Sequence, residues 1–310
     1  MTGLGIAGAG RLGEALIKEV PRIPDLQVVA VQDANLARAH EMAGRHSIPW
    51  SGQEYEDLLR VERVDGVAVC TPNALHADQA QAALRAGKHV LVQKPLALSL
   101  GDAQATIEVA MQADRVLVVD YSYRFLETVA ALHDTIDRPV RAASAVFHNI
   151  YGPGAERTWF FDPRLSGGGA LVDLGVHLLD LGLWLLAPRE PTLLDADLSG
   201  SGPVEHAASL RIALDGVPFD VDVSWNAPRS QTRIAFEARL DDGASVSWEN
   251  VDGSFFHFRT LRDGVVLVDR ETSLREDTLR AFKQAVSLGA APSIDTRVYA
   301  LLDRAYGRAP

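Results

Sequence analysis

Hydrophobic residues in the first 120 positions fall into short runs that alternate with segments of helical spacing. Between successive runs, apolar residues recur at intervals of three and four, which is the spacing of one helix face. This alternation is typical of a parallel sheet whose strands are joined by crossover helices. We therefore predict strands at residues 4–7, 27–33, 66–70, 89–92 and 116–121, and helices at residues 11–20, 36–44, 54–61, 74–86 and 100–112.

The pattern changes at about residue 140, where apolar and polar residues begin to alternate. Turns such as Asp215-Gly216 and Asp263-Gly264 separate several of these segments, as antiparallel connections do. The expected elements are strands at residues 141–148, 207–214, 217–225, 232–240 and 245–249, and helices at residues 169–186 and 274–287. We predict an α/β chain, with a doubly wound parallel sheet in residues 1–121 and an α+β domain with an open, mostly antiparallel sheet in residues 122–310.

The helix expected at residues 169–186 carries a polar stripe within an apolar sequence. Asp173, His177 and Asp180 follow one another at spacings of four and three, which places them on one helix face. A buried carboxylate or imidazole costs free energy unless it is paired or has a task. The stripe therefore has two interpretations, a hydrogen bond within the core or an acid/base site.

Composition narrows the classes of partner. The chain has 310 residues and a formal net charge of −11, which argues against a nucleic-acid or anionic membrane surface as the main partner. Its single cysteine, Cys70, excludes an intramolecular disulfide and suits a reducing, cytoplasmic environment. The N-terminus enters a strand without a signal segment, and no run is expected to reach the apolar length of a membrane span. We expect no metal site, because His133, His148, His206 and His257 are scattered and no cluster with the spacing of metal ligands is evident.

A glycine-rich segment follows the first strand directly and opens a helix, which is the context of a dinucleotide-binding turn. Gly8 permits the tight turn, Gly10 lets the backbone approach a pyrophosphate, and Gly13 lets helix and strand pack closely. Asp33 ends the second strand 20 residues after Gly13, where a carboxylate accepts hydrogen bonds from ribose hydroxyls and repels a 2′-phosphate. We predict NAD rather than NADP, and we expect Arg38 at a solvated helix position. The alternative is a glycine turn in an unrelated α/β protein.

Two further segments, one from Thr71 to His76 and one that contains Lys94, each follow a predicted strand. In an open parallel sheet the ligand binds beyond the carboxyl ends of the strands, so both segments are expected to face it. Lys94 can donate a hydrogen bond to a substrate hydroxyl or alkoxide, although a surface lysine is the alternative. His76 either touches the ligands or has a capping or structural role. The residues assigned to the cofactor site are Gly8, Ala9, Gly10, Arg11, Leu12, Asp33, Thr71, Pro72, Asn73, His76, Gln93 and Lys94.

Together these residues resemble the Gfo/Idh/MocA family of glucose-fructose oxidoreductase, inositol dehydrogenase and rhizopine-catabolism proteins. The resemblance implies a Rossmann domain and an NAD(P)-dependent oxidoreductase of sugars, cyclitols or related polyols. It implies that Lys94, Asp173 and His177 are catalytic, that the Lys94-Pro95 peptide is cis, and that the chain forms homodimers or homotetramers. The matching segments are Gly8 to Gly13, Thr71-Pro72-Asn73 with His76, Ala86 to Val90, Lys94-Pro95, Tyr121 with Arg124-Phe125, and Gly167-Gly168-Gly169 with Asp173, Gly175, His177 and Asp180.

One position departs from the family pattern. The family usually has Glu before the lysine and proline, whereas this chain has Gln93. Glutamine keeps the shape and an acceptor oxygen but removes a negative charge from this part of the site. If that charge holds the lysine protonated, Lys94 has a lower pKa here than its counterparts.

We hypothesise that His177 is the general base that takes a hydroxyl proton while the carbon-bound hydrogen leaves as hydride. Asp173 orients the imidazole or holds a neighbouring hydroxyl, and Lys94 stabilises alkoxide character. Asp180 is assigned a supporting or substrate-contact role. The residues expected in the substrate pocket are Tyr121, Arg124, Trp159, Asp173 and His177, with packing as the alternative for the first three.

Two other functions are compatible with these residues. One is an NAD-dependent glycosidase, which oxidises a sugar transiently, eliminates the aglycone and regenerates its cofactor. The other is a non-catalytic NAD sensor, which the change at Gln93 favours and the set of Lys94, Asp173 and His177 disfavours.

Overall fold

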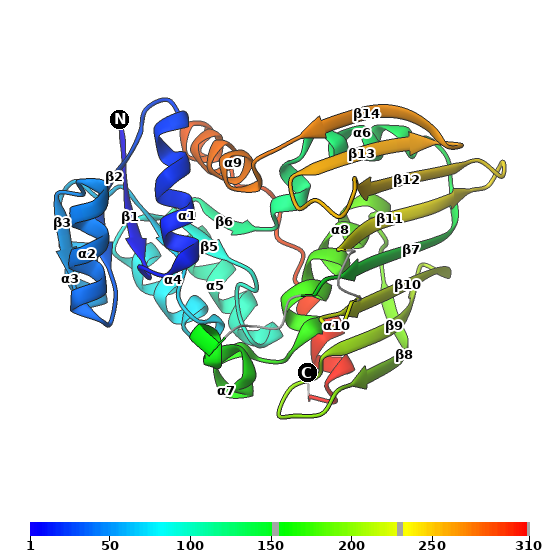
Figure 1. Ribbon diagram of the computed structural model, residues 1–310, viewed down its shortest axis with the longest axis horizontal. Coiled ribbons are helices and arrows are strands. Elements are labelled where there is room, and N and C mark those ends of the chain that lie inside the picture. The colour runs from blue at the N-terminus through cyan, green and yellow to red at the C-terminus, as the bar shows by residue number, and fades with distance from the viewer. Residues whose placement is uncertain (151–154, 228–231, 309–310) are drawn as a thin grey trace. The chain divides into compact units, whose positions relative to one another are not determined.

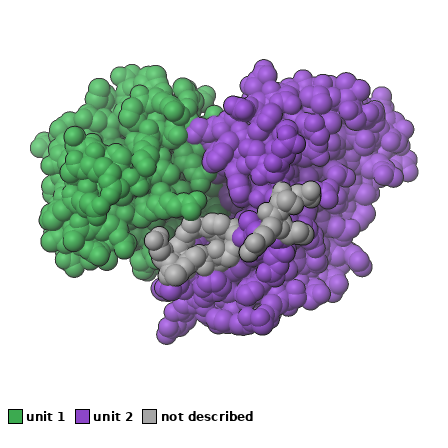
Figure 2. Space-filling view, viewed as in Figure 1, with its two compact units in different colours: residues 1–120, 275–294 green, residues 121–274, 295–310 purple. Residues whose placement is uncertain are grey.

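The computed structural model describes residues 1–150, 155–227 and 232–308. The chain divides into two compact units, which Figure 2 distinguishes by colour. Unit 1 comprises residues 1–120 and 275–294, and unit 2 comprises residues 121–274 and 295–310. The division expected after residue 121 differs from this, because the chain returns to unit 1 near its end. Local periodicity carries no information on which unit a late helix joins.

Unit 1 is built on a six-stranded parallel sheet with the order β3-β2-β1-β4-β5-β6. The order changes direction between β1 and β4, which is the switch point of a doubly wound sheet. Its strands are β1 (Thr2–Ala7), β2 (Leu26–Gln32), β3 (Trp50–Gly52), β4 (Gly66–Val69), β5 (His89–Gln93) and β6 (Leu117–Asp120). Five of these six were expected from the sequence, and β3, with three residues, is too short to show a period.

The crossover helices of unit 1 are amphipathic or partly buried segments that the sequence predicted. All residues of β4 and all but the first of β5 are buried, as expected for parallel strands covered on both faces. Asn35 and Ser99 cap α2 and α5 by accepting backbone N–H bonds. The helices are α1 (Arg11–Glu19), α2 (Leu36–His46), α3 (Tyr55–Arg60), α4 (His76–Arg85) and α5 (Leu100–Ala113), and most of α9 (Leu274–Leu288) belongs to the same unit.

Unit 2 contains an eight-stranded sheet with the order β14-β13-β12-β11-β7-β10-β9-β8. Among the described strand pairs of this sheet only β7–β10 is parallel, so the expected open and mostly antiparallel sheet is confirmed. The strands are β7 (Val140–His148), β8 (Pro191–Ser199), β9 (Ala207–Leu214), β10 (Val217–Ser224), β11 (Arg233–Leu240), β12 (Ser245–Asn250), β13 (His257–Arg262) and β14 (Val265–Glu271). The sequence did not predict β8, β13 or β14.

One face of this sheet is covered by helices and the other is polar. Leu210 and Val221 are buried, whereas their neighbours Arg211 and Asp220 are exposed, which is the period of a half-buried strand. The covering helices lie along the same face in Figure 1 and are α6 (Glu127–Thr135), α8 (Val176–Leu186) and α10 (Arg297–Ala305).

The segment with the polar stripe is not one regular helix. It begins with α7 (Pro163–Ser166), continues as a π-helical turn over Leu171–Gly175, and ends with α8 (Val176–Leu186). The sequence predicted one helix over residues 169–186, so the π turn is a difference from that expectation. Such turns occur frequently at functional sites.

The carboxylate of Glu205 holds the start of the π turn. It accepts hydrogen bonds from the backbone N–H groups of Gly169 and Leu171, each at 2.9 Å, and from the Tyr306 hydroxyl at 2.7 Å. Glu205 is only 9% exposed, so these donors replace the water that the carboxylate loses on folding. They also satisfy backbone groups that the start of a helix leaves without partners.

One described helical stretch, Pro163–Leu186, is long and apolar enough to cross a membrane by length and composition alone. No run of this apolar length was expected from the sequence, and an 18-residue window of the stretch with a mean hydropathy of 1.6 corrects that expectation. In the structure 78% of that window is buried, and the core helix of a soluble protein passes the same test. Its α8 part packs against α10, β7 and β10.

Replacing Glu205 with Ala should lower the free energy of unfolding by roughly 2–4 kcal/mol, because buried N–H groups lose their acceptor. Urea unfolding followed by circular dichroism measures the change. Glu205→Gln is the matched control and should lose less, since its amide oxygen still accepts a hydrogen bond. Equal stability of the Ala variant and the unmodified protein would contradict this role of Glu205.

Candidate functional site

The turn between β1 and α1 has the geometry of a dinucleotide-binding turn. Gly8 has a φ of +98°, and a Cβ at this position would lie 2.7 Å from the Cys70 carbonyl oxygen. A Cβ on Gly13 would lie 2.2 Å from the Gly8 carbonyl oxygen, so α1 approaches the turn closely. A Cβ on Gly10 would meet no atom within 4 Å, and no side chain caps the start of α1. The turn therefore fits a pyrophosphate at the helix N-terminus.

Asp33 lies just beyond β2 and is held by backbone donors. Its Oδ2 accepts the Ala9 N–H and its Oδ1 accepts the Asn35 N–H, both at 2.9 Å. The Arg38 side chain is 55% exposed, as expected for a solvated helix position, and its guanidinium lies 3.6 Å from Asp33 Oδ2. The carboxylate thus has a fixed place at the end of β2, with one cation beside it. Arg11 and Leu12 begin α1 on the same turn.

His76 ties together the segments that follow β4 and β5. It is 1% exposed, and its Nδ1 lies 2.7 Å from the Pro95 carbonyl oxygen and its Nε2 2.8 Å from the Thr71 carbonyl oxygen. Burial lowers the pKa of His76, and the two carbonyl groups oppose that shift. The ring thereby positions two backbone segments at this edge of the sheet. Pro72 and Asn73 belong to the first of them, and Asn73 is buried.

Lys94 follows the last residue of β5, and its peptide bond to Pro95 is cis, as the resemblance implied. Burial is the main cause of the lowered pKa of His76, and the positive charge of Lys94 contributes to it. Gln93 is 7% exposed, and its side-chain amide donates to Asp120 Oδ2 at 2.7 Å. The assignment of these residues to a cofactor site stays a prediction.

Unit 2 contains the second part of the candidate site. Within residues 166–183, all of which the structure describes, Asp173 and His177 are half-buried and every other residue is buried. The polar stripe therefore brings these two side chains to the surface of an otherwise buried segment. Polar groups on a rigid, well-packed element are held in a defined geometry, as acid/base chemistry requires.

The surroundings of Asp173 and His177 are aromatic. The Trp225 indole N–H donates to Asp173 Oδ2 at 3.1 Å, and the Trp225 side chain is buried. The His177 ring packs edge-on against Tyr123 and Tyr121, with centroid distances of 5.1 and 6.5 Å. The hydrogen bond from the Trp225 indole fixes the direction of the Asp173 carboxylate.

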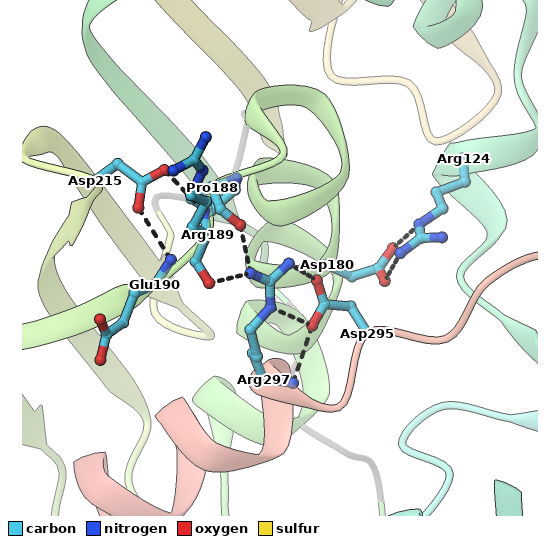
Figure 3. A network of polar contacts seen from close by, with 8 residues as sticks. All are labelled: Arg124, Asp180, Pro188, Arg189, Glu190, Asp215, Asp295 and Arg297. Atoms are coloured by element: carbon cyan, nitrogen blue, oxygen red, sulfur yellow. Dashed lines mark hydrogen bonds and ion pairs between the residues drawn. The ribbon is translucent and has the colours of Figure 1, made fainter.

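Asp180, the third member of the stripe, has a different environment. It is 1% exposed, and Arg124 donates to both of its oxygens, from Nε at 2.6 Å and from Nη2 at 2.5 Å (Figure 3). Burial raises the pKa of Asp180 to about 7, Arg124 opposes this shift, and Asp295 adds to it. Asp295 in turn forms an ion pair with Arg297. Asp180 thus binds the Arg124 fork that was proposed for the substrate, which favours the packing alternative for Arg124 and the supporting alternative for Asp180. Substrate contact by either residue stays a prediction.

Two further pocket candidates differ in exposure. Tyr121 is 4% exposed, and its hydroxyl lies 3.0 Å from the hydroxyl of Tyr299. Trp159 is half-buried within a 3₁₀ segment (Ala155–Phe161), and its ring centroid lies 4.0 Å from that of Phe160. Trp159 therefore keeps part of a flat apolar surface accessible, whereas Tyr121 packs within unit 2.

The sequence did not single out several residues that hold the site. Trp225 was expected only as the end of a strand, and Tyr123 and Asp120 were not considered. Tyr123 contacts His177, and Asp120 contacts Gln93. Both contacts join segments that are distant in the chain, so no local spacing predicts them. Trp225 had one available signal, because a tryptophan at a strand end carries a donor that needs a partner when buried.

Two family models match the chain. One is described as "Oxidoreductase family, NAD-binding Rossmann fold" and matches residues 2–121. The other is described as "GFO/IDH/MocA C-terminal domain" and matches residues 138–246. The two matches fall on unit 1 and on the sheet of unit 2, so the predicted fold class is confirmed.

Named relatives include sugar oxidoreductases. The 1,5-anhydro-D-fructose reductase of Ensifer adhaerens is 34% identical over 181 residues, which cover 57% of this chain and 54% of the reductase. The chain spans about half the length of the first curated relatives it matches. Levoglucosan dehydrogenase in complex with NADH has a TM-score of 0.83 at 20% identity, covering 98% of this chain and 95% of the dehydrogenase.

A second solved structure carries the other cofactor. A 3-ketoreductase from Actinomadura kijaniata, in complex with NADP and TDP-benzene, has a TM-score of 0.82 at 21% identity. The match covers 97% of this chain and 94% of the ketoreductase. These likenesses show the fold, and the neighbours include both NADH and NADP complexes.

Replacing Arg124 with Met should lower the free energy of unfolding by roughly 3–5 kcal/mol at pH 8, because the buried Asp180 carboxylate loses its cation. The pKa of Asp180 is about 7 in the folded protein, above its ordinary value of 3.8. Its contribution to stability is therefore fully present below about pH 4 and is lost as the pH rises through 7. Without Arg124 this pKa rises further, so the variant should lose less stability at pH 5 than at pH 8.

Urea unfolding at the two pH values measures both losses. The double variant Arg124→Met/Asp180→Leu is the matched control, since it lacks the titrating carboxylate and should show no such pH dependence. Equal losses at pH 5 and pH 8 in the single variant would contradict the assignment.

Proposed function

We propose that this chain, which belongs to the GFO/IDH/MocA oxidoreductase family, transfers a hydride between a nicotinamide dinucleotide and a hydroxyl-bearing carbon of a sugar or related polyol. The observation that carries the proposal is the pair of half-buried polar side chains, Asp173 and His177, on a buried segment of unit 2. Relatives named as a 1,5-anhydro-D-fructose reductase and a levoglucosan dehydrogenase support the substrate class.

In this proposal His177 moves the proton. An imidazole has an ordinary pKa of about 6.5, so at neutral pH it can accept the hydroxyl proton of the substrate and return it in the reverse reaction. The edge-on packing of Tyr123 limits the rotation of the ring, which keeps its nitrogens in a fixed direction. The nicotinamide, when bound, accepts the hydride that leaves the same carbon.

Asp173 and Lys94 have supporting roles in the proposed reaction. Asp173, fixed by the Trp225 indole, accepts a hydrogen bond from a substrate hydroxyl or from the imidazole. Lys94 donates to the substrate oxygen and stabilises negative charge there as the proton leaves. The backbone around Lys94 is held by His76 through the Pro95 carbonyl, which reduces the reorganisation that this role requires.

Asp33 favours NAD as the cofactor. Its carboxylate is fixed by two backbone N–H groups at the place where an adenosine ribose is bound in this fold, so it accepts from ribose hydroxyls and repels a 2′-phosphate. Arg38, 3.6 Å away, offers a positive charge that weakens the repulsion. We therefore propose a preference for NAD that is not absolute.

Replacing Asp33 with Asn should shift the ratio of kcat/KM for NAD to kcat/KM for NADP toward NADP by about tenfold or more, because the repulsive charge is removed. Steady-state rates with both cofactors measure the ratio. Arg38→Ala is the control and should shift the ratio in the opposite direction. An unchanged ratio in Asp33→Asn would contradict the assignment of the ribose site.

Replacing His177 with Ala should lower kcat by about 10²- to 10⁴-fold and leave the affinity for NAD nearly intact, because the base is lost while unit 1 is unchanged. A panel of aldoses, inositols, deoxy sugars and anhydro sugars, scored for NADH formation, supplies the substrate. Near-normal turnover in His177→Ala would contradict the assignment.

Hydrolysis of a glycoside without net NADH would favour the glycosidase alternative, and saturable NAD binding without turnover of any compound would favour the sensor.

A further inference from the structure

The carboxyl ends of β5 and β6 hold a buried amide–carboxylate pair. Gln93 ends β5 and Asp120 ends β6, and the two residues are partners in the parallel register. The Gln93 amide donates to Asp120 Oδ2, and the Thr278 hydroxyl of α9 donates to Asp120 Oδ1, both at 2.7 Å. The three residues are 7%, 3% and 0% exposed, respectively. Each carboxylate oxygen therefore has a neutral donor at a position that solvent hardly reaches.

Two neutral donors stabilise a carboxylate without cancelling its charge. The negative charge of Asp120 affects the pKa of Cys70, which lies just beyond β4. Burial raises the pKa of the Cys70 thiol, Asp120 raises it further, and Arg275 lowers it. Asp120 thus brings a negative charge to the edge formed by the ends of β4, β5 and β6. This is the edge at which ligands bind in a doubly wound sheet.

The presence of Asp120 accounts for glutamine at position 93. A glutamate there would place a second carboxylate within hydrogen-bonding distance of the first, and two such groups cannot both ionise without a large cost. The Gln93 amide instead supplies the donor that the buried Asp120 needs. The negative charge that was expected to be missing at position 93 is therefore present on the neighbouring strand.

We propose that Gln93 and Asp120 act as one unit with a single negative charge, and that this charge makes unit 1 favour an oxidised over a reduced nicotinamide dinucleotide. The second half of the proposal rests on the proposed function. The oxidised ring is a cation and gains from a nearby anion, whereas the reduced ring is neutral and does not. The pair lies on the β4–β6 half of the sheet, and Asp33, assigned to the adenosine ribose, lies at the end of β2 on the other half.

Three variants of the full chain separate the effect of the negative charge at positions 93 and 120 from the effect of side-chain shape there. Asp120→Asn removes the charge and leaves an amide that can still bond to Gln93. Gln93→Glu adds a second carboxylate beside the first. The double variant Gln93→Glu/Asp120→Asn moves the single charge from β6 to β5. Glu108→Gln, at an exposed position of α5, is the matched control for loss of one negative charge.

The first measurement is thermal unfolding without cofactor. Gln93→Glu should lower Tm relative to the unmodified protein, and more at pH 8 than at pH 5, because the two carboxylates repel each other when both are ionised. The double variant should recover most of that loss, since one amide again faces one carboxylate. A double variant no more stable than Gln93→Glu would overturn the pairing.

The second measurement is the ratio of the NADH and NAD⁺ dissociation constants, from calorimetric titrations. Asp120→Asn should shift this ratio toward NADH by roughly 3- to 10-fold, and the double variant should return it to within about twofold of the unmodified value. Glu108→Gln should leave it unchanged, because solvent screens an exposed charge. An unchanged ratio in Asp120→Asn, or a double variant that keeps the ratio of Asp120→Asn, would overturn the proposed role of the charge.

The two measurements also distinguish this inference from the proposed function. Binding of neither NAD⁺ nor NADH to the unmodified protein would overturn the proposed function together with the cofactor preference. The unfolding experiment would still decide on the pairing of Gln93 with Asp120, because it involves no ligand.

Discussion

A charged group taken out of water must meet donors or an opposite charge within the protein, and this constraint shapes both units. Glu205 accepts hydrogen bonds from backbone N–H groups and a tyrosine hydroxyl, and Asp180 forms an ion pair with the Arg124 guanidinium. Asp33 accepts hydrogen bonds from two backbone N–H groups, and Asp120 accepts them from a side-chain amide and a hydroxyl. In each case at least one partner comes from a distant part of the chain. Each buried carboxylate therefore also fixes how two or three segments join.

The positions of Asp173 and His177 on unit 2 depend on two of these buried carboxylates. Glu205 fixes the start of the π turn that carries Asp173, and Arg124 neutralises Asp180 within the following helix. Only Asp173 and His177 then reach the surface of residues 166–183. A carboxylate and an imidazole on so rigid a segment lose little entropy when they meet a ligand, which favours chemistry over a purely structural role.

Periodicity predicted most of unit 1, because strands buried on both faces and amphipathic helices leave strong local patterns. It failed where that pattern is absent. The edge strand β14 is exposed along nearly all its length, so no buried face marks it, and β3 is too short. The dinucleotide turn and Asp33 were predictable for the same reason as the strands, since turn, helix and carboxylate lie within one local unit. The pairing of Arg124 with Asp180 was not, because 56 residues separate them.

The change at position 93 shows why a single residue can mislead. Considered alone, Gln93 signifies a lost charge and a weakened site. The register of β5 and β6 places it opposite Asp120, and the hydrogen bond between them makes the amide a requirement of the carboxylate. The charge at a sheet edge is thus a property of neighbouring strand ends taken together. Substitutions at either end are coupled, because changing one residue alone either removes the charge or places two like charges in contact.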